Sequence, residues 1–177
     1  MQRKTRALTW ITVLLITLLA LSVPFVAEAD EGVEVRVIRI IDGDTIRVDL
    51  PILGDTSVRF IGMDTPESRK NNRTKLQARE EGKDIEEIIA LGKRATKHLK
   101  SKLKKDDMVR LEFDAERTDR YGRVLAYVWS GDTMLNALMV RDGYAYPLTI
   151  PPNVKYEELF RDLFREAREQ GRGLWGD

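Results

Sequence analysis

The sequence predicts an α+β fold in which a small five-stranded β-barrel carries about three helices. Stretches that read as strands come first in a group of three and later in a group of two. Apolar residues at helical spacing lie between these groups and again after the second. The sequence has no internal repeat and no low-complexity segment, and 177 residues suit a single domain.

The first group of strands reads as an antiparallel meander. Residues 33–41 alternate and then become wholly apolar, as expected for a strand that enters a core. Asp42-Gly43 is a hairpin signal, and the alternation resumes over residues 45–50. Residues 51–56 are expected to form a loop, and residues 57–63 the third strand.

The middle of the chain predicts a loop, a long helix and two more strands. Residues 68–84 are polar and strongly charged, so we expect a mobile loop there. Residues 85–103 carry apolar side chains at helical spacing, with lysines on the other face. Residues 108–113 and 124–129 are expected to be strands around the loop at 117–123.

Two helices are expected at the C-terminal end. Asp132 or Thr133 can cap a short helix that Gly143 ends. An amphipathic pattern over residues 156–167 predicts a final helix that ends at Gly171. This order of elements fits a Greek-key barrel of the oligonucleotide-binding type, the OB-fold.

Residues 1–29 are interpreted as a signal peptide that precedes a domain of residues 30–177. The first six residues include three basic ones, residues 7–26 are uncharged, and Ala27-Glu28-Ala29 fits a small-x-small cleavage site. A retained membrane anchor is the alternative, because an apolar run of about 20 residues can span a bilayer. The sequence therefore predicts a secreted protein, or else one anchored to the membrane and facing outside.

Charge and composition restrict the possible chemistry. Without residues 1–29 the chain keeps 27 basic and 28 acidic side chains, so only a local patch could attract a polyanion. The chain has no cysteine and a single histidine, His98. Thiol nucleophiles, thiolate metal sites and the common zinc sites are therefore excluded, and any metal would need oxygen ligands.

The segment from Arg59 to Glu67 concentrates the candidate metal ligands. Asp64 would supply a charged oxygen and Thr65 a backbone carbonyl, while Asp44 would supply a second carboxylate from upstream. Three such ligands leave positions on a calcium ion for water and a substrate phosphate. The alternative is that Asp42 and Asp44 are ordinary turn residues.

Arg59 and Arg123 are the candidate phosphate-binding residues, because a guanidinium pairs two donors with two phosphate oxygens. Either could instead form a surface salt bridge. In a regular strand Arg59 and Asp64 would face opposite sides, so we expect the strand to twist or end before Asp64, with Gly62 a suitable place. Glu67 is the candidate general base, with helix capping or ion pairing near Ser68 as the alternative.

Other residues receive weaker interpretations. His98 lies among lysines and is expected to be an exposed helix residue, whereas Trp129 and Trp175 are expected in the core. Tyr121 could stack on a base or bind a phosphate. The basic residues of segment 69–79 could follow a nucleic-acid backbone or simply be solvated.

Three motifs in this order resemble the staphylococcal nuclease (thermonuclease) family. They are Ile41 to Thr45, then Arg59 with Asp64-Thr65-Pro66-Glu67, then Asp119 to Tyr127, and the similarity continues to Gly173-Leu174-Trp175. The resemblance implies an OB-fold and calcium-dependent cleavage of DNA and RNA that leaves 3′-phosphate ends. Position by position, it implies Asp44, Asp64 and the Thr65 carbonyl as calcium ligands; Arg59, Glu67 and Arg123 as catalytic side chains; and Arg120 and Tyr121 beside the nucleotide.

The chain departs from the family pattern in two places. The charged segment after Glu67 is longer, which could alter access for the substrate. The residues near Thr149 to Pro151 stand where the family has a nucleotide-contacting tyrosine, for which Tyr144 or Tyr146 could substitute.

The sequence-based hypothesis is thus a secreted, monomeric, calcium-dependent nuclease that acts on DNA and RNA. The alternative is a noncatalytic nucleic-acid-binding OB-fold module. That alternative predicts the loss of acidic ligands or arginines, yet all of them are present.

Overall fold

The computed structural model describes residues 32–176. The signal peptide expected at residues 1–29, like the alternative of a retained anchor, lies outside the described residues. No helix within residues 32–176 has the length and apolar character that crossing a bilayer requires.

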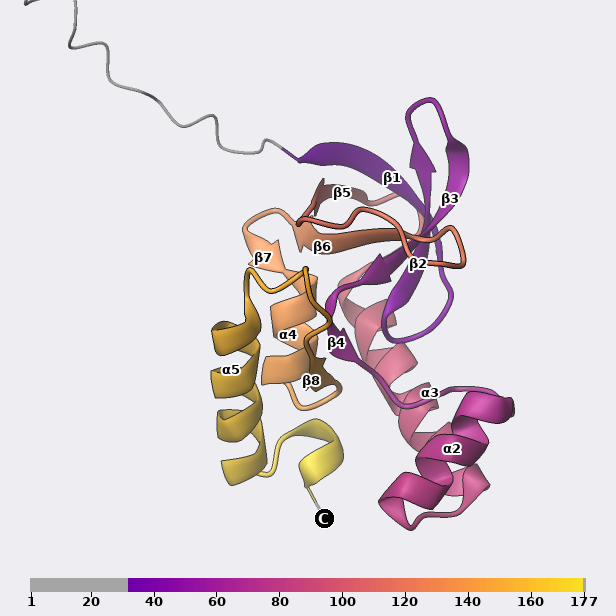
Figure 1. The fold of residues 1–177 in the computed structure, drawn as a ribbon, viewed down its shortest axis with the longest axis vertical. Helices are drawn as coiled ribbons and strands as arrows, with labels where there is room; N and C mark the ends of the chain where they lie inside the picture. Colours follow the sequence, from indigo (N-terminus) through magenta and orange to yellow (C-terminus); the bar gives the residue numbers. More distant parts are fainter. Residues whose placement is uncertain (1–31, 177) are drawn as a thin grey trace, which may run out of the picture.

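Five strands close into a barrel, which confirms the expected OB-fold (Figure 1). They are β1 (Val33–Ile40), β2 (Thr45–Leu50), β3 (Gly54–Phe60), β5 (Met108–Glu112) and β6 (Val124–Ser130). Their order is β3-β2-β1-β5-β6, with antiparallel neighbours. A parallel pairing of β3 with β6, which sets Val58 opposite Val124, completes the ring.

Alternation along the strands fills the barrel interior. In β1, Val35 and Val37 are buried while Arg36 between them is exposed, as the sequence pattern predicts. The expected loop at 51–56 is shorter than predicted, because β3 already begins at Gly54, opposite Leu50. A three-residue turn therefore joins β2 to β3.

The chain leaves the barrel at Gly62. The expected strand 57–63 is interrupted there: β3 ends at Phe60, and a short strand β4 (Gly62–Asp64) pairs instead with β8 (Tyr146–Leu148). Gly62 has a φ of 78°, and a Cβ atom at this position would lie 2.1 Å from the ring of Phe160. Only glycine combines this conformation with so close an approach.

Buried Asn136 holds the backbone on the barrel side of this break. Its side-chain amide donates a hydrogen bond of 2.9 Å to the carbonyl of Ile61, and its carbonyl oxygen accepts one of 2.8 Å from the N–H of Val128. Asn136 thereby joins β6 to the residue before Gly62.

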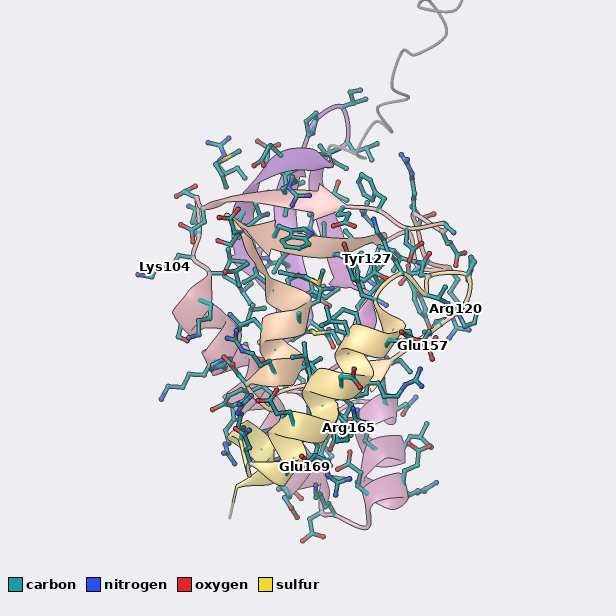
Figure 2. All side chains as sticks on the ribbon, turned by 90° about the vertical axis from the view of Figure 1, so that its left-hand side faces the viewer. Lys104, Arg120, Tyr127, Glu157, Arg165 and Glu169 are labelled. Atoms are coloured by element: carbon teal, nitrogen blue, oxygen red, sulfur yellow. The ribbon has the colours of Figure 1, made fainter. Side chains whose placement is uncertain are left out.

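Three helices occupy the expected regions. They are α3 (Ile85–Lys102), α4 (Leu135–Arg141) and α5 (Glu157–Glu169), and a 3₁₀ turn, η1 (Gly173–Trp175), follows. Figure 1 shows α4 and α5 side by side on one side below the barrel and α3 on the other. Tyr127 of β6 is buried between the barrel and α5, with its ring 6.1 Å from that of Phe160 (Figure 2).

The predicted cap of α4 is wrong. Neither Asp132 nor Thr133 caps the helix: Thr133 belongs to the short strand β7 (Thr133–Met134), and Met134 is the N-cap residue, without a side-chain hydrogen bond. Asp132 lies in the tight turn between β6 and β7, where aspartate is equally favoured. Gly143 follows the end of the helix with a φ of 78°, as expected.

The charged segment 68–84, expected to be a mobile loop, contains a fourth helix among residues 32–176. This helix is α2 (Asn72–Glu81). The Asn71 side chain accepts a hydrogen bond of 2.8 Å from the N–H of Thr74, and the Thr74 hydroxyl accepts one of 3.2 Å from the N–H of Asn71. This reciprocal cap gives hydrogen-bond partners to the backbone N–H groups of Asn71 and Thr74, at the beginning of the helix. Gly82, in the left-handed region, ends the helix.

His98 is not the exposed residue that its lysine neighbours suggested. Its side chain is 16% exposed, and its ring stacks on Tyr144 at 4.1 Å between centroids. Its Nε2 lies 2.9 Å from a carboxylate oxygen of Asp142. Trp129 and Trp175, expected in the core, are only half-buried.

Candidate active site

Asp44 and Arg59 form the buried centre of the candidate site. The pairing of Thr45 with Arg59 across β2 and β3 brings them together. They form an ion pair in which the Arg59 side chain is 11% and the Asp44 side chain 4% exposed. Asp44 also accepts hydrogen bonds from the N–H and the hydroxyl of Thr65, at 3.0 and 2.9 Å. Burial alone would raise the pKa of Asp44, but the charge of Arg59 and hydrogen bonds that include these two hold it below its usual value.

Asp64 contacts the same guanidinium. The other terminal nitrogen of Arg59 forms an ion pair with Asp64, so Arg59 bridges the two carboxylates. The break at Gly62 makes this possible, because it changes the direction of the chain between Arg59 and Asp64. The expectation that the strand carrying Arg59 ends before Asp64 is therefore confirmed, because β3 ends at Phe60.

Glu67, the candidate base, is held by the beginning of α2. One carboxylate oxygen accepts a hydrogen bond of 2.9 Å from the Asn71 amide, and the other lies 3.2 Å from Nε of Arg73. The N–H of Glu67 donates to the side chain of Gln77 in α2, at 3.0 Å. From the other side, Gly92 of α3 approaches so closely that a Cβ there would lie 2.4 Å from the Glu67 carbonyl oxygen.

Arg123 comes from the loop between β5 and β6. Its Nε donates a hydrogen bond of 2.7 Å to Asp119, which also accepts hydrogen bonds from the N–H groups of Tyr121 and Arg123. Arg120 and Arg123 both lie over the Tyr121 ring, at 4.8 and 5.7 Å from its centroid. Figure 2 shows Arg120 at the outer edge of the molecule.

One cleft of about 420 Å³ joins the arginines of this region, whereas Asp44, Asp64 and Glu67 are not among its lining residues. Its lining includes four residues that the sequence singled out: Arg59, Arg120, Tyr121 and Arg123. Arg73 lines it as well and links it to Asp64 and Glu67 through ion pairs. The structure thus brings four arginines to one cleft, as expected for a phosphate site. Ion pairs of Arg59 and Arg73 connect this cleft to three carboxylates, those of Asp44, Asp64 and Glu67.

Neither tyrosine proposed as a substitute contact lines this cleft. Tyr144 stacks on His98, and Tyr146 packs against Phe164 and Trp175. Where the family pattern has its tyrosine, Leu148 and Ile150 line the cleft instead.

Asp44 and Asp64 fit a calcium ion in the type of their oxygen atoms, because Ca²⁺ prefers carboxylates and carbonyls. Both carboxylates converge on one cationic group, Arg59. Asp42 lies close by, but burial, and then the charge of Asp44, raise its pKa to about 7, so it carries less negative charge near neutral pH than an ordinary aspartate. Within residues 32–176, no three or more His, Cys, Asp or Glu side chains are grouped so that they could hold a metal. Calcium held here would therefore also need the Thr65 carbonyl, water or substrate as ligands.

Sequence reasoning missed the parts played by Arg73, Asn71 and Asp119. From the sequence, Arg73 is only one of several basic residues in an expected loop. The available signal was Asn71 three residues before Thr74, a spacing that permits a reciprocal cap and would have indicated a helix. Asp119 begins the third motif, but no local pattern indicates that it holds Arg123, because that contact depends on the shape of the turn.

Comparisons with known proteins agree with this geometry. The model of the family described as "Staphylococcal nuclease homologue" matches residues 57–177. The thermonuclease of Staphylococcus intermedius is 39% identical over 77% of this chain and 73% of its own length. The thermonuclease of Staphylococcus hyicus is 37% identical over 80% and 75%, and Endonuclease YhcR of Bacillus subtilis is 31% identical over 78% of this chain and 11% of its own. The barrel, the cleft and these matches together show that the chain belongs to the staphylococcal nuclease family.

Proposed function

We propose that this protein is a secreted, calcium-dependent nuclease that hydrolyses phosphodiester bonds of DNA and RNA and leaves 3′-phosphate ends. The observation that carries the proposal is the cleft lined by Arg59 and Arg123, which ion pairs of Arg59 connect to Asp44 and Asp64. An ion pair of Arg73, which also lines the cleft, connects it to Glu67. The thermonuclease and endonuclease names of its relatives support the same reaction class.

In this proposal Arg59 and Arg123 bind the oxygens of the phosphate that is attacked. Both remain charged throughout, and their forked donors stabilise the negative charge that gathers on the phosphoryl oxygens. Asp119 orients Arg123 through a hydrogen bond of 2.7 Å, while the carboxylates of Asp44 and Asp64 fix Arg59. Tyr121 and Arg120 border the cleft where a nucleotide would stack.

Glu67 orients the attacking water or accepts a proton from it. The water oxygen bonds to phosphorus as the bond from phosphorus to the 5′-oxygen breaks, which leaves phosphate on the 3′ side and a hydroxyl on the 5′ side. Calcium, when bound by Asp44, Asp64 and the Thr65 carbonyl, would supply positive charge to a phosphate oxygen and polarise that water.

A cleavage assay tests the reaction and the metal together. Purified protein is incubated with plasmid DNA and with RNA, in calcium or in a chelator. Degradation of both substrates only in calcium is expected. Because a 3′-phosphate blocks primer extension, the products should become extendable only after treatment with a phosphatase. Binding without cleavage would favour the noncatalytic module instead.

Secretion follows from the proposed cleavage after Ala29 and is tested separately. The exported protein should have an intact mass that lacks residues 1–29, whereas a mass that includes them would indicate a membrane anchor. We further propose that the protein acts as a monomer, which sedimentation of the exported form would check.

A further inference from the structure

Arg73 occupies an unusual position on the carboxylate of Asp64. A single terminal nitrogen of Arg73 lies 2.7 Å from one oxygen of Asp64 and 2.6 Å from the other. A nitrogen nearly equidistant from both oxygens lies close to the bisector of the carboxylate. A calcium ion bound by both oxygens takes the same position, at about 2.3–2.6 Å from each.

The helix that carries Arg73 is anchored at the candidate site. Arg73 is in the first turn of α2, and the cap between Asn71 and Thr74 fixes that turn. Asn71 and Arg73 each bind one oxygen of Glu67. The beginning of α2 therefore engages both oxygens of Asp64 and both oxygens of Glu67.

Arg73 and Arg59 differ in how easily each could leave. The Arg59 side chain is 11% exposed and bridges two carboxylates, whereas the Arg73 side chain is 46% exposed. A half-exposed guanidinium regains hydration when its ion pair breaks, so its release costs little. Arg73 is thus the cation at this site that a metal can displace.

We propose that Arg73 is a built-in competitor for the metal position at Asp64. This inference rests on the proposed function, because it takes Asp64 as a calcium ligand. Arg73 neutralises Asp64 while calcium is absent. Calcium binding displaces it, and its departure also frees the oxygen of Glu67 that it holds. Helix α2 therefore links metal binding to the availability of the candidate base.

Calcium titration by calorimetry on the full chain tests this competition without relying on activity. Arg73→Gln should bind calcium roughly fivefold more tightly than the wild type, the scale of a partly exposed ion pair. Arg79→Gln is the matched control, because Arg79 is exposed in the last turn of the same helix, about 9 Å farther along its axis. It makes the same change in net charge and should leave the affinity unchanged. Arg73→Lys keeps the charge and should give an intermediate affinity.

The possible outcomes separate this inference from the proposed function. A denaturation midpoint for Arg73→Gln in chelator that matches that of Arg79→Gln would show that the fold is intact. Tighter calcium binding by Arg73→Gln alone supports the competition. Affinity equal to that of Arg79→Gln, or weaker, overturns it, even if plasmid cleavage requires calcium. Absence of calcium binding in every protein overturns it as well, and plasmid cleavage in chelator then shows whether nuclease activity survives without the metal.

Discussion

Arg59 and Arg123 carry the same charge in different surroundings, so their removal should have different effects on stability. Arg59→Ala leaves two carboxylates without their shared partner and is expected to lower the free energy of unfolding by about 3 kcal/mol. Arg123 pairs with Asp119, and its side chain is 31% exposed, so Arg123→Ala should cost less than about 1 kcal/mol. Urea unfolding in chelator measures both values.

Both substitutions are expected to lower turnover by roughly two orders of magnitude or more, the usual effect of losing a donor to the transition state. Initial rates of plasmid cleavage, measured in calcium on folded protein, check this. Arg120→Ala serves as a comparison, because Arg120 lines the outer part of the cleft and should act mainly on KM. Unchanged turnover in a folded variant removes that arginine from the mechanism.

Single residues could be recognised from the sequence where a strong local constraint applies. In a regular strand the side chains of Arg59 and Asp64 would face opposite sides, so a shared site required a break between them. Gly62 was the residue able to provide that break. The side chain of Arg73 could not be placed in the same way, because its contacts depend on where α2 begins. The candidate roles of Asp44, Asp64 and Glu67 remain predictions from motif and geometry.

At the scale of elements, Gly92 permits α3 to contact the backbone of the Pro66-Glu67 segment. Glycine within a helix normally costs about 1 kcal/mol relative to alanine, so Gly→Ala there usually stabilises. Here the added methyl would collide with backbone, 2.4 Å from the Glu67 carbonyl oxygen. Gly92→Ala is therefore expected to destabilise the protein and to lower turnover roughly tenfold to a hundredfold by moving Glu67. Urea unfolding and cleavage rates measure the two effects.

Lys93→Ala provides the control for this change. Lys93 is exposed on the next position of the same helix, so the substitution raises helix propensity without adding atoms at the contact. Stability and turnover should stay close to the wild type. A stabilised and fully active Gly92→Ala would mean that α3 does not position Glu67.

The helices differ in how well their sequences revealed them. Helix α3 has a strong apolar face, whose Ala95 and Leu99 enter the core, and its pattern predicted it. Helix α2 buries only Thr74 and Ala78, so it lacks the periodic apolar signal on which such predictions depend. It is recognisable instead by its cap.

At the scale of the whole molecule, His98 should make folding stability depend on pH. Burial lowers the pKa of His98 below its ordinary value, even though Asp142 acts in the opposite direction, while Lys102 and Arg141 lower it further. Below about pH 6.5 the unfolded chain therefore binds more protons than the folded one at this residue. The contribution of His98 to stability should fall as the pH drops through this range.

The test compares the wild type with His98→Gln by urea unfolding from pH 8 to pH 5. Other groups, such as Asp42, titrate in both proteins, so the difference between the two curves isolates the histidine. That difference should shift in favour of His98→Gln as the pH falls. Parallel curves would contradict the role of burial.

The barrel itself was predictable, but its closure was not. Alternating or continuously apolar stretches indicated all five strands: β1 buries one face, whereas β6 is buried at five consecutive positions. The pairing of β3 with β6 joins Val58 to Val124 across the whole helical insertion, and no local pattern specifies which edges meet over such a separation.

This seam between β3 and β6 has a consequence for incomplete chains. A polypeptide that stops before Val124 contains β1, β2, β3 and β5, yet nothing can cover the outer backbone groups of β3 and β5. Unpaired strand edges of this kind can form hydrogen bonds with strands of other molecules. Chains truncated before β6 should therefore aggregate rather than remain as soluble barrels, because β6 is the strand that covers both open edges.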